Sequence, residues 1–110
     1  MRFMMLVCSD AEPDNEPEKP GEIEAWVEDN DSSGRRIMGD RLAAVGEAKT
    51  VRVRRKHKII TDGPFAECKE VILGFDILEC DSMEEAVEIA SRHPVARTGR
   101  IEVRAFYDWG

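Results

Sequence analysis

Two patterned parts of this chain meet at Ile60-Thr-Asp-Gly-Pro-Phe-Ala-Glu-Cys-Lys-Glu70. Asp62-Gly63-Pro64 strongly favours a turn, because Asp bonds to the backbone that follows it, Gly permits positive φ, and Pro fixes φ. Three polar side chains then follow, Glu67, Lys69 and Glu70, before a new apolar run begins. We therefore predict that this stretch is a corner joining a β-hairpin to a long core strand.

The segments on both sides of the corner have the patterns of strands. Thr50–Arg54 alternates polar and apolar residues, and Lys58–Thr61 is predicted to be its antiparallel partner, with a turn near Arg55–His57. Val71–Cys80 is a long apolar run that predicts a core strand. Gly74 inside it indicates a bulge or the close approach of another backbone.

The N-terminal part predicts a strand, a loop, a helix and an extended segment. Residues 2–8 form a continuous apolar run, typical of a strand in the middle of a sheet, and residues 10–21 are polar with three prolines. A helix is expected at about 20–32, because apolar residues recur there at helical spacing behind an acidic first turn. Arg36 to about Ala43 is expected to be a strand.

The C-terminal part predicts a second helix and a last strand. Ser82 and Glu85 have the spacing of a capping box, and Pro94 ends the helical pattern. After Gly99, alternation resumes and predicts a strand that runs to about Tyr107. The fold class is therefore α+β: a ferredoxin-like βαββαβ domain with an inserted β-hairpin and an antiparallel sheet with helices on one face.

Such a sheet leaves its second face without helices. Because residues 2–8 and Val71–Cys80 are apolar throughout, we expect a homodimer in which two sheets pack face to face through this surface.

Composition restricts the classes of function. The 110 residues, with a formal charge of −7, form one domain over 1–110. This charge opposes general binding to nucleic acid or to an anionic membrane. No apolar run approaches the roughly 20 residues of a membrane span, and none resembles a signal peptide, so we expect a cytoplasmic protein. The basic cluster Arg52–Lys58 is either a solvated hairpin face or a site for an anion or a partner.

No cofactor or metal site is expected. The three cysteines, Cys8, Cys68 and Cys80, have neither disulfide-framework nor zinc spacing, and Cys8 and Cys80 are expected to be buried thiols. The chain has no P-loop, nucleophile elbow or dinucleotide fingerprint.

The central stretch also resembles a known family. Thr61–Glu67, followed by Lys69-Glu70 and Gly74-Phe75, is similar to the motif of the YCII-related, DGPF-domain family of small bacterial proteins. The similarity continues downstream through Ser82–Ala86, Arg92–Pro94 and Ile101–Arg104.

The resemblance implies a dimeric α+β barrel of ferredoxin-like subunits. Relatives in the wider superfamily have been proposed as enzymes with a His–Asp pair, and DGPF proteins are often encoded beside extracytoplasmic-function sigma factors. This chain has Asp76 where family members usually have an aromatic or apolar residue.

Two carboxylates are candidate catalytic groups. Asp76 interrupts a core strand, where burial would raise its pKa and suit it to acid/base chemistry; alternatively it pairs with an arginine or faces solvent. Asp62 either stabilises the turn by bonding to backbone amides or acts as an acid/base group.

Four side chains are candidates for ligand binding: Glu67, Lys69 and Glu70 in the corner, and Arg104 in the last strand. The first three either rim a cleft or tie the corner to the sheet. Arg104, which faces the same way as Glu102 in the last strand, either binds substrate or forms a cross-strand ion pair. His57 is expected in solvent, and His93 is expected to cap a helix end.

Two functions remain open from the sequence. The first is a homodimer that binds a small polar molecule between the sheet and the corner, with acid/base chemistry by Asp76 or Asp62. The second is a non-enzymatic accessory or regulatory partner in a sigma-factor pathway, with the corner as its contact surface.

Overall fold

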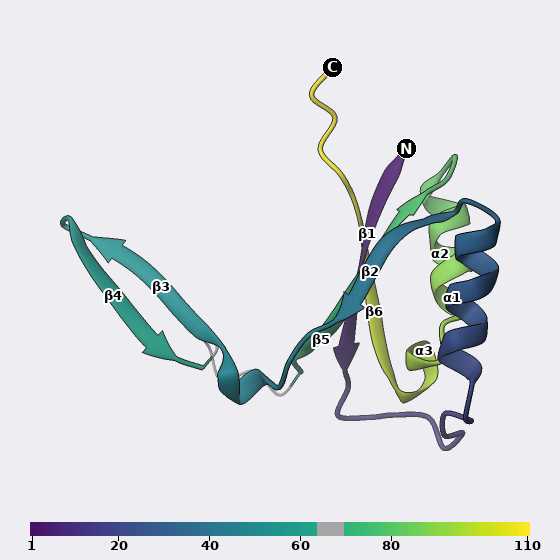
Figure 1. The fold of residues 1–110 in the computed structure, drawn as a ribbon, viewed down its shortest axis with the longest axis horizontal. Coiled ribbons are helices and arrows are strands. Elements are labelled where there is room, and N and C mark those ends of the chain that lie inside the picture. The colour runs from purple at the N-terminus through teal and green to yellow at the C-terminus, as the bar shows by residue number, and fades with distance from the viewer. Residues whose placement is uncertain (64–69) are drawn as a thin grey trace.

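Four strands form the central antiparallel sheet of the computed structural model, which describes residues 1–63 and 70–110 (Figure 1). β1 (Arg2–Ser9) lies between β5 (Ile72–Glu79) and β6 (Gly99–Ala105), and β2 (Arg36–Arg41) pairs with the other side of β5. The order β2-β5-β1-β6, with helices between β1 and β2 and between β5 and β6, confirms the predicted ferredoxin-like topology.

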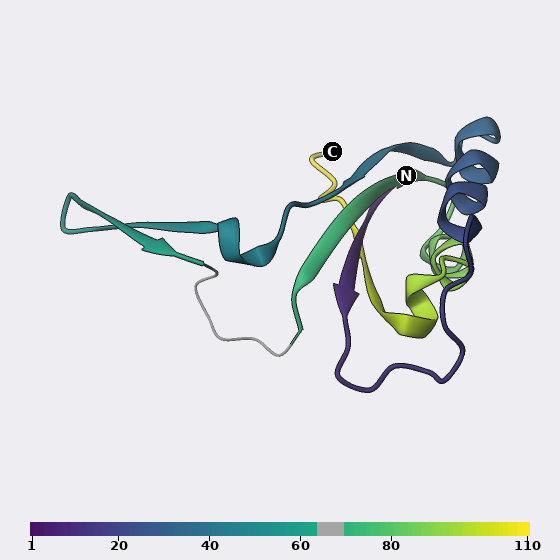
Figure 2. The same ribbon diagram turned by 60° about the horizontal axis from the view of Figure 1, so that its bottom comes forward.

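The helices lie on one face of this sheet (Figure 2). They are α1 (Glu22–Ser32), α2 (Met83–Ser91) and the short α3 (Val95–Thr98), which the sequence patterns did not predict. The Ser82 hydroxyl accepts a hydrogen bond from the Glu85 N–H at 3.1 Å, so half of the predicted capping box is present. The Glu85 carboxylate accepts from Asp81 N–H rather than from Ser82 N–H.

The core lies between the sheet and the helices. Alternate residues of β1, Phe3, Met5 and Val7, point toward the helices and are buried. On β5 the same face holds Leu78, which is fully buried. The predicted burial of Cys80 is confirmed, whereas Cys8, on the opposite face of β1, is only half-buried.

The opposite face of the sheet carries apolar side chains that no helix covers. Met4 lies opposite Ile77, and Leu6 lies opposite Phe75, so these four half-buried side chains form a continuous patch, which we call the open face. Met38 of β2 extends the open face next to Ile77.

The predicted bulge near Gly74 is also present. The register between β1 and β5 shifts between Val7 and Cys8, where Val7 pairs with Gly74 and Cys8 pairs with Ile72. A Cβ on Gly74 would lie 2.7 Å from the carbonyl oxygen of Asp40. The missing side chain therefore lets β2 approach β5.

The inserted hairpin extends away from the body of the protein. It consists of β3 (Lys49–Arg54) and β4 (His57–Asp62), follows the short 3-10 helix Val45–Glu47, and is called the arm below. The arm lies on the far side of the sheet from α1 and α2 (Figure 1). The radius of gyration is 16.1 Å, against about 13 Å for a compact chain of this length.

Among the described residues, no helix is long and apolar enough to cross a membrane.

Candidate functional site

The candidate site is a cavity of about 300 Å³ between the sheet and the helices. β5 contributes Gly74 and Asp76 to its lining, β2 contributes Arg36, and His93 and Val95 come from the turn after α2 and from α3. Two apolar side chains of α1, Ile23 and Val27, lie on the opposite wall. Such a mixture of apolar walls with a few polar groups is typical of small-molecule sites.

Asp76 projects from β5 toward the helices and is only 6% exposed. Its Oδ1 accepts a hydrogen bond from Arg36 Nε at 2.7 Å, so the alternative of an arginine partner is correct. Burial raises the pKa of Asp76, and the Arg36 guanidinium opposes that rise. Within the described part of the chain, Oδ2 makes no hydrogen bond and can accept one from a ligand.

Arg36 is held by three acceptors. Besides Asp76, it donates to Asp31 Oδ1 at 2.9 Å and to the carbonyl oxygen of Gly39 at 3.0 Å. Gly39 lies opposite Asp76 in the β2–β5 register, and a Cβ at this position would overlap the Asp76 carboxylate. The absent side chain at Gly39 is therefore what allows Asp76 and Arg36 to meet beside β2.

His93 supplies the second buried polar group of the cavity and is 5% exposed. Its Nδ1 accepts a hydrogen bond from the backbone N–H of Val95 at 3.1 Å. Burial lowers the pKa of His93, assisted by Arg36 and opposed by Glu18, so the neutral ring is favoured. Because Nδ1 is the acceptor, the proton is on Nε2, and His93 offers the cavity a hydrogen-bond donor.

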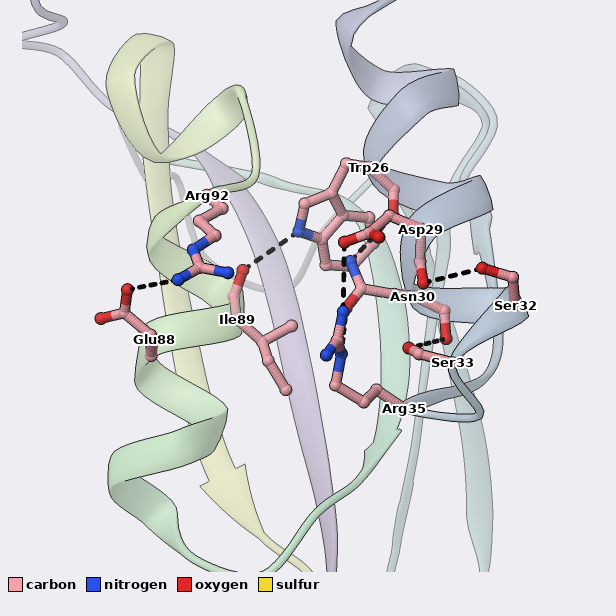
Figure 3. A network of polar contacts seen from close by, with 9 residues as sticks. All are labelled: Trp26, Asp29, Asn30, Ser32, Ser33, Arg35, Glu88, Ile89 and Arg92. Carbon is pink, nitrogen blue, oxygen red and sulfur yellow. Dashed lines mark hydrogen bonds and ion pairs between the residues drawn. The ribbon is translucent and has the colours of Figure 1, made fainter.

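The orientation of His93 depends on Trp26. The two rings meet edge to face, with centroids 4.7 Å apart. The Trp26 indole N–H donates to the carbonyl oxygen of Ile89 at 3.0 Å, which fixes the indole between α1 and α2 (Figure 3). Asn30 Nδ2 donates to the Trp26 carbonyl oxygen at 2.8 Å, and Asn30 Oδ1 accepts from Arg35 Nε (Figure 3). These bonds secure the C-terminal end of α1.

The other candidates from the sequence do not line this cavity. Asp62, at the end of β4, forms an exposed ion pair with Lys49. Glu70 pairs with Arg100 at 3.2 Å. Arg104 is exposed on β6, and its Nε lies 4.0 Å from Oε2 of Glu102, so the ion pair seen among the described residues is within one strand rather than across two. Glu67, Lys69 and Cys68 lie outside the described residues.

Sequence reasoning identified Asp76 but missed its neighbours. His93 was expected to cap the end of the second helix. Instead its Nδ1 accepts a hydrogen bond from Val95, the first residue of α3, and the ring is buried in the cavity. Arg36 was assigned only to the beginning of a strand. Its place opposite Asp76 follows from the β2–β5 register, for which the sequence has no local signal.

A larger groove of about 720 Å³ lies elsewhere, between the loop Asp10–Asp14, α2 and β6. It is the weaker candidate, because its half-buried Asp10 and exposed Arg100 already bond to each other at 3.0 Å. The described residues contain no group of three or more His, Cys, Asp or Glu side chains that could hold a metal ion.

Comparison with known proteins assigns the chain to a family. The model of the YCII-related domain matches residues 1–110. The chain is also similar to an uncharacterised protein of Rhizobium meliloti (strain 1021), with 42% identity over 66 residues. That similarity covers 58% of this chain and 53% of the relative, so it spans about half of the relative's length. Because the family model covers the whole chain, this protein belongs to the YCII-related domain family.

Proposed function

We propose that the cavity binds a small molecule in which a carbonyl oxygen lies next to a hydroxyl or C–H group, and that Asp76 transfers a proton at that group. The observation that carries this proposal is the placement of two buried groups of opposite hydrogen-bonding capacity, His93 and Asp76, on one cavity. The Nε2–H of His93 can donate a hydrogen bond to the carbonyl oxygen, and the free Oδ2 of Asp76 can accept the acidic proton.

The surroundings of Asp76 support a role in proton transfer. Burial raises its pKa, which makes the carboxylate a stronger base than an exposed aspartate. The neutral His93 ring can stabilise the negative charge that develops on a carbonyl oxygen when a neighbouring proton leaves. Ile23, Val27 and Val95 line the same space and reduce competition from water.

The proposal is tested by deuterium exchange. The protein in D₂O is mixed with a panel of small α-hydroxy ketones and α-hydroxy aldehydes, and incorporation of deuterium at the α-carbon is followed by proton NMR. The wild-type protein is expected to accelerate deuterium exchange in one class of these compounds. Asp76→Asn is expected to slow this exchange about 100-fold, because it removes the general base. His93→Gln is expected to weaken binding of the same compound.

Asp62→Asn is the matched control, because it makes the same change on an exposed carboxylate at the arm. It is expected to exchange at the wild-type rate. If a compound binds without exchange and Asp76→Asn abolishes that binding, the cavity is a binding site but Asp76 does not transfer a proton. No binding in the whole panel would favour the accessory role beside a sigma factor.

We also propose that the protein is a homodimer through the open face. Met4, Leu6, Phe75 and Ile77 form an apolar surface that a second copy of the same sheet can cover. Ile77→Glu is expected to convert the dimer to a species of 12.5 kDa in sedimentation, because two like charges would meet at the centre of the interface. Val87→Glu, which changes an equally apolar but exposed side chain on α2, should leave the mass unchanged.

A further inference from the structure

The arm stands apart from the central sheet. Its two strands pair with each other over six residue pairs, from Lys49–Asp62 at the base to Arg54–His57 at the tip. In the described part of the molecule, neither strand belongs to the four-stranded sheet. An isolated two-stranded hairpin is marginally stable in water, so such an arm gains stability by packing against another surface.

One side of the arm is suited to such packing. Val51 and Val53 of β3 are both 59% exposed, and Ile60 of β4, which lies opposite Val51, is 55% exposed. Lys58 lies opposite Val53 and therefore shares this side. The arm thus presents an apolar surface next to a positive charge.

The tip of the arm adds two more positive charges in an unfavourable backbone conformation. Arg55 and Lys56 connect the strands with φ of 50° and 66°, in the left-handed region. Two-residue hairpin turns of this kind favour Asn-Gly, and long side chains adopt the conformation at an energetic cost. Strain of this kind is often retained where the side chains have a function.

Charge separates the arm from the rest of the chain. Residues 49–62 contain six of the 16 Lys and Arg residues and one of the 23 Asp and Glu residues, so the arm carries +5 and the remainder −12. A second copy of the chain therefore offers the arm an oppositely charged surface. Nucleic acid fits less well, because the acidic body would be repelled and the apolar side of the arm would stay uncovered.

A groove along α1, which we call the α1 groove, has the chemistry that complements the arm. Ile23 and Val27 form its apolar part, and Glu24, Glu28 and Asp31 supply acidic groups. Among the described residues, Glu24 and Glu28 form no ion pair, and no basic side chain lines the groove. Since the arm and α1 lie on opposite sides of the same molecule, the arm cannot reach its own α1 groove (Figure 1).

We propose that the arm of one copy docks into the α1 groove of a second copy. Val51, Val53 and Ile60 pack against Ile23 and Val27, while Lys58 and the tip residues Arg55 and Lys56 face Glu24 and Glu28. This contact does not use the open face. It shares Ile23 and Val27 with the wall of the cavity but leaves the polar groups of the cavity, Asp76 and His93, untouched. Together with pairing through the open face, it produces an assembly larger than a dimer.

The test exchanges charges between the two surfaces. Arg55→Glu/Lys56→Glu/Lys58→Glu changes the charge of the arm from +5 to −1, and Glu24→Lys/Glu28→Lys makes the groove basic. In sedimentation at low ionic strength, each variant alone is expected to associate at least tenfold more weakly than wild type, because its arm and groove then have like charge. An equimolar mixture is expected to regain association, because each arm meets a groove of opposite charge.

A mixture that associates no better than the separate variants would overturn the proposal. Unchanged association of the acidic-arm variant, with loss of nucleic acid that co-purifies with wild type, would overturn it in favour of a nucleic-acid partner. Arg55→Asn/Lys56→Gly separates charge from folding, since it removes both tip charges and favours the hairpin turn. This variant is expected to melt no lower than wild type and still to associate more weakly; wild-type association would contradict the role of the tip.

Discussion

Arg36→Met is expected to lower the free energy of unfolding by about 3 kcal/mol at pH 7.5, because it leaves a buried carboxylate without its partner. Asp76 is 6% exposed, and Arg36 Nε lies 2.7 Å from its Oδ1. Methionine fills similar space but donates no hydrogen bond. Urea denaturation followed by circular dichroism measures the loss.

The pH dependence of this loss of stability shows whether the unpaired Asp76 carboxylate causes it. Burial already raises the pKa of Asp76, and Arg36 opposes this rise, so the pKa is expected to rise further in the variant. A carboxyl group with a raised folded-state pKa binds protons more readily in the folded protein, so its contribution to stability increases as pH falls through that pKa. The deficit of Arg36→Met should therefore shrink between pH 7.5 and pH 5.

The double variant Arg36→Met/Asp76→Asn is the control. It removes both charges, and its stability is expected to recover most of the loss and to show no such shrinking with pH. An equal deficit in the single and double variants would mean that packing of the Arg36 side chain, rather than the unpaired carboxylate, stabilises this region.

Gly39→Ala is expected to destabilise the protein by about 2–3 kcal/mol and to abolish ligand binding in the cavity. The new Cβ would overlap the Asp76 carboxylate and lie 2.6 Å from the carbonyl oxygen of Phe75. The carbonyl belongs to the paired strand β5 and cannot move away without breaking the sheet, so Asp76 must leave its position beside Arg36. The loss is measured by urea denaturation, and the binding by the NMR panel.

Gly46→Ala is the matched control for this change. Gly46 lies in the short 3-10 helix before the arm and has no left-handed φ, and a Cβ added to it would meet no atom within 4 Å. Its replacement should alter stability by no more than about 0.5 kcal/mol. If both alanine variants behaved alike, contact with Asp76 would not be the reason for glycine at position 39.

Much of the fold follows from local patterns. The alternation in Thr50–Arg54 and Lys58–Thr61 corresponds to the strands of the arm, and the spacing of Ser82 and Glu85 marks the start of α2. These features could be predicted because side-chain periodicity and helix capping act between residues close in sequence. The short α3 was missed, because four residues do not establish a period.

The candidate site shows the limit of such reasoning. Asp76 was recognised because a carboxylate is unusual in a core strand. The prediction of a raised pKa followed from its expected burial. Its partner Arg36 is 40 residues away in sequence, and His93 reaches the same cavity from the end of α2. Neither has a neighbour in sequence that indicates the cavity.

Local patterns alone predict the α+β class, the strand and helix segments, the inserted hairpin and the unusual position of Asp76. The three-dimensional structure was needed to show that Gly39, Arg36 and Asp76 meet across β2 and β5, that His93 joins them, and that the arm lies apart from the body. The physical reason is that strand register and the packing of helices on a sheet depend on contacts between distant residues. Local spacing describes one element at a time, whereas a site requires several elements to be placed together.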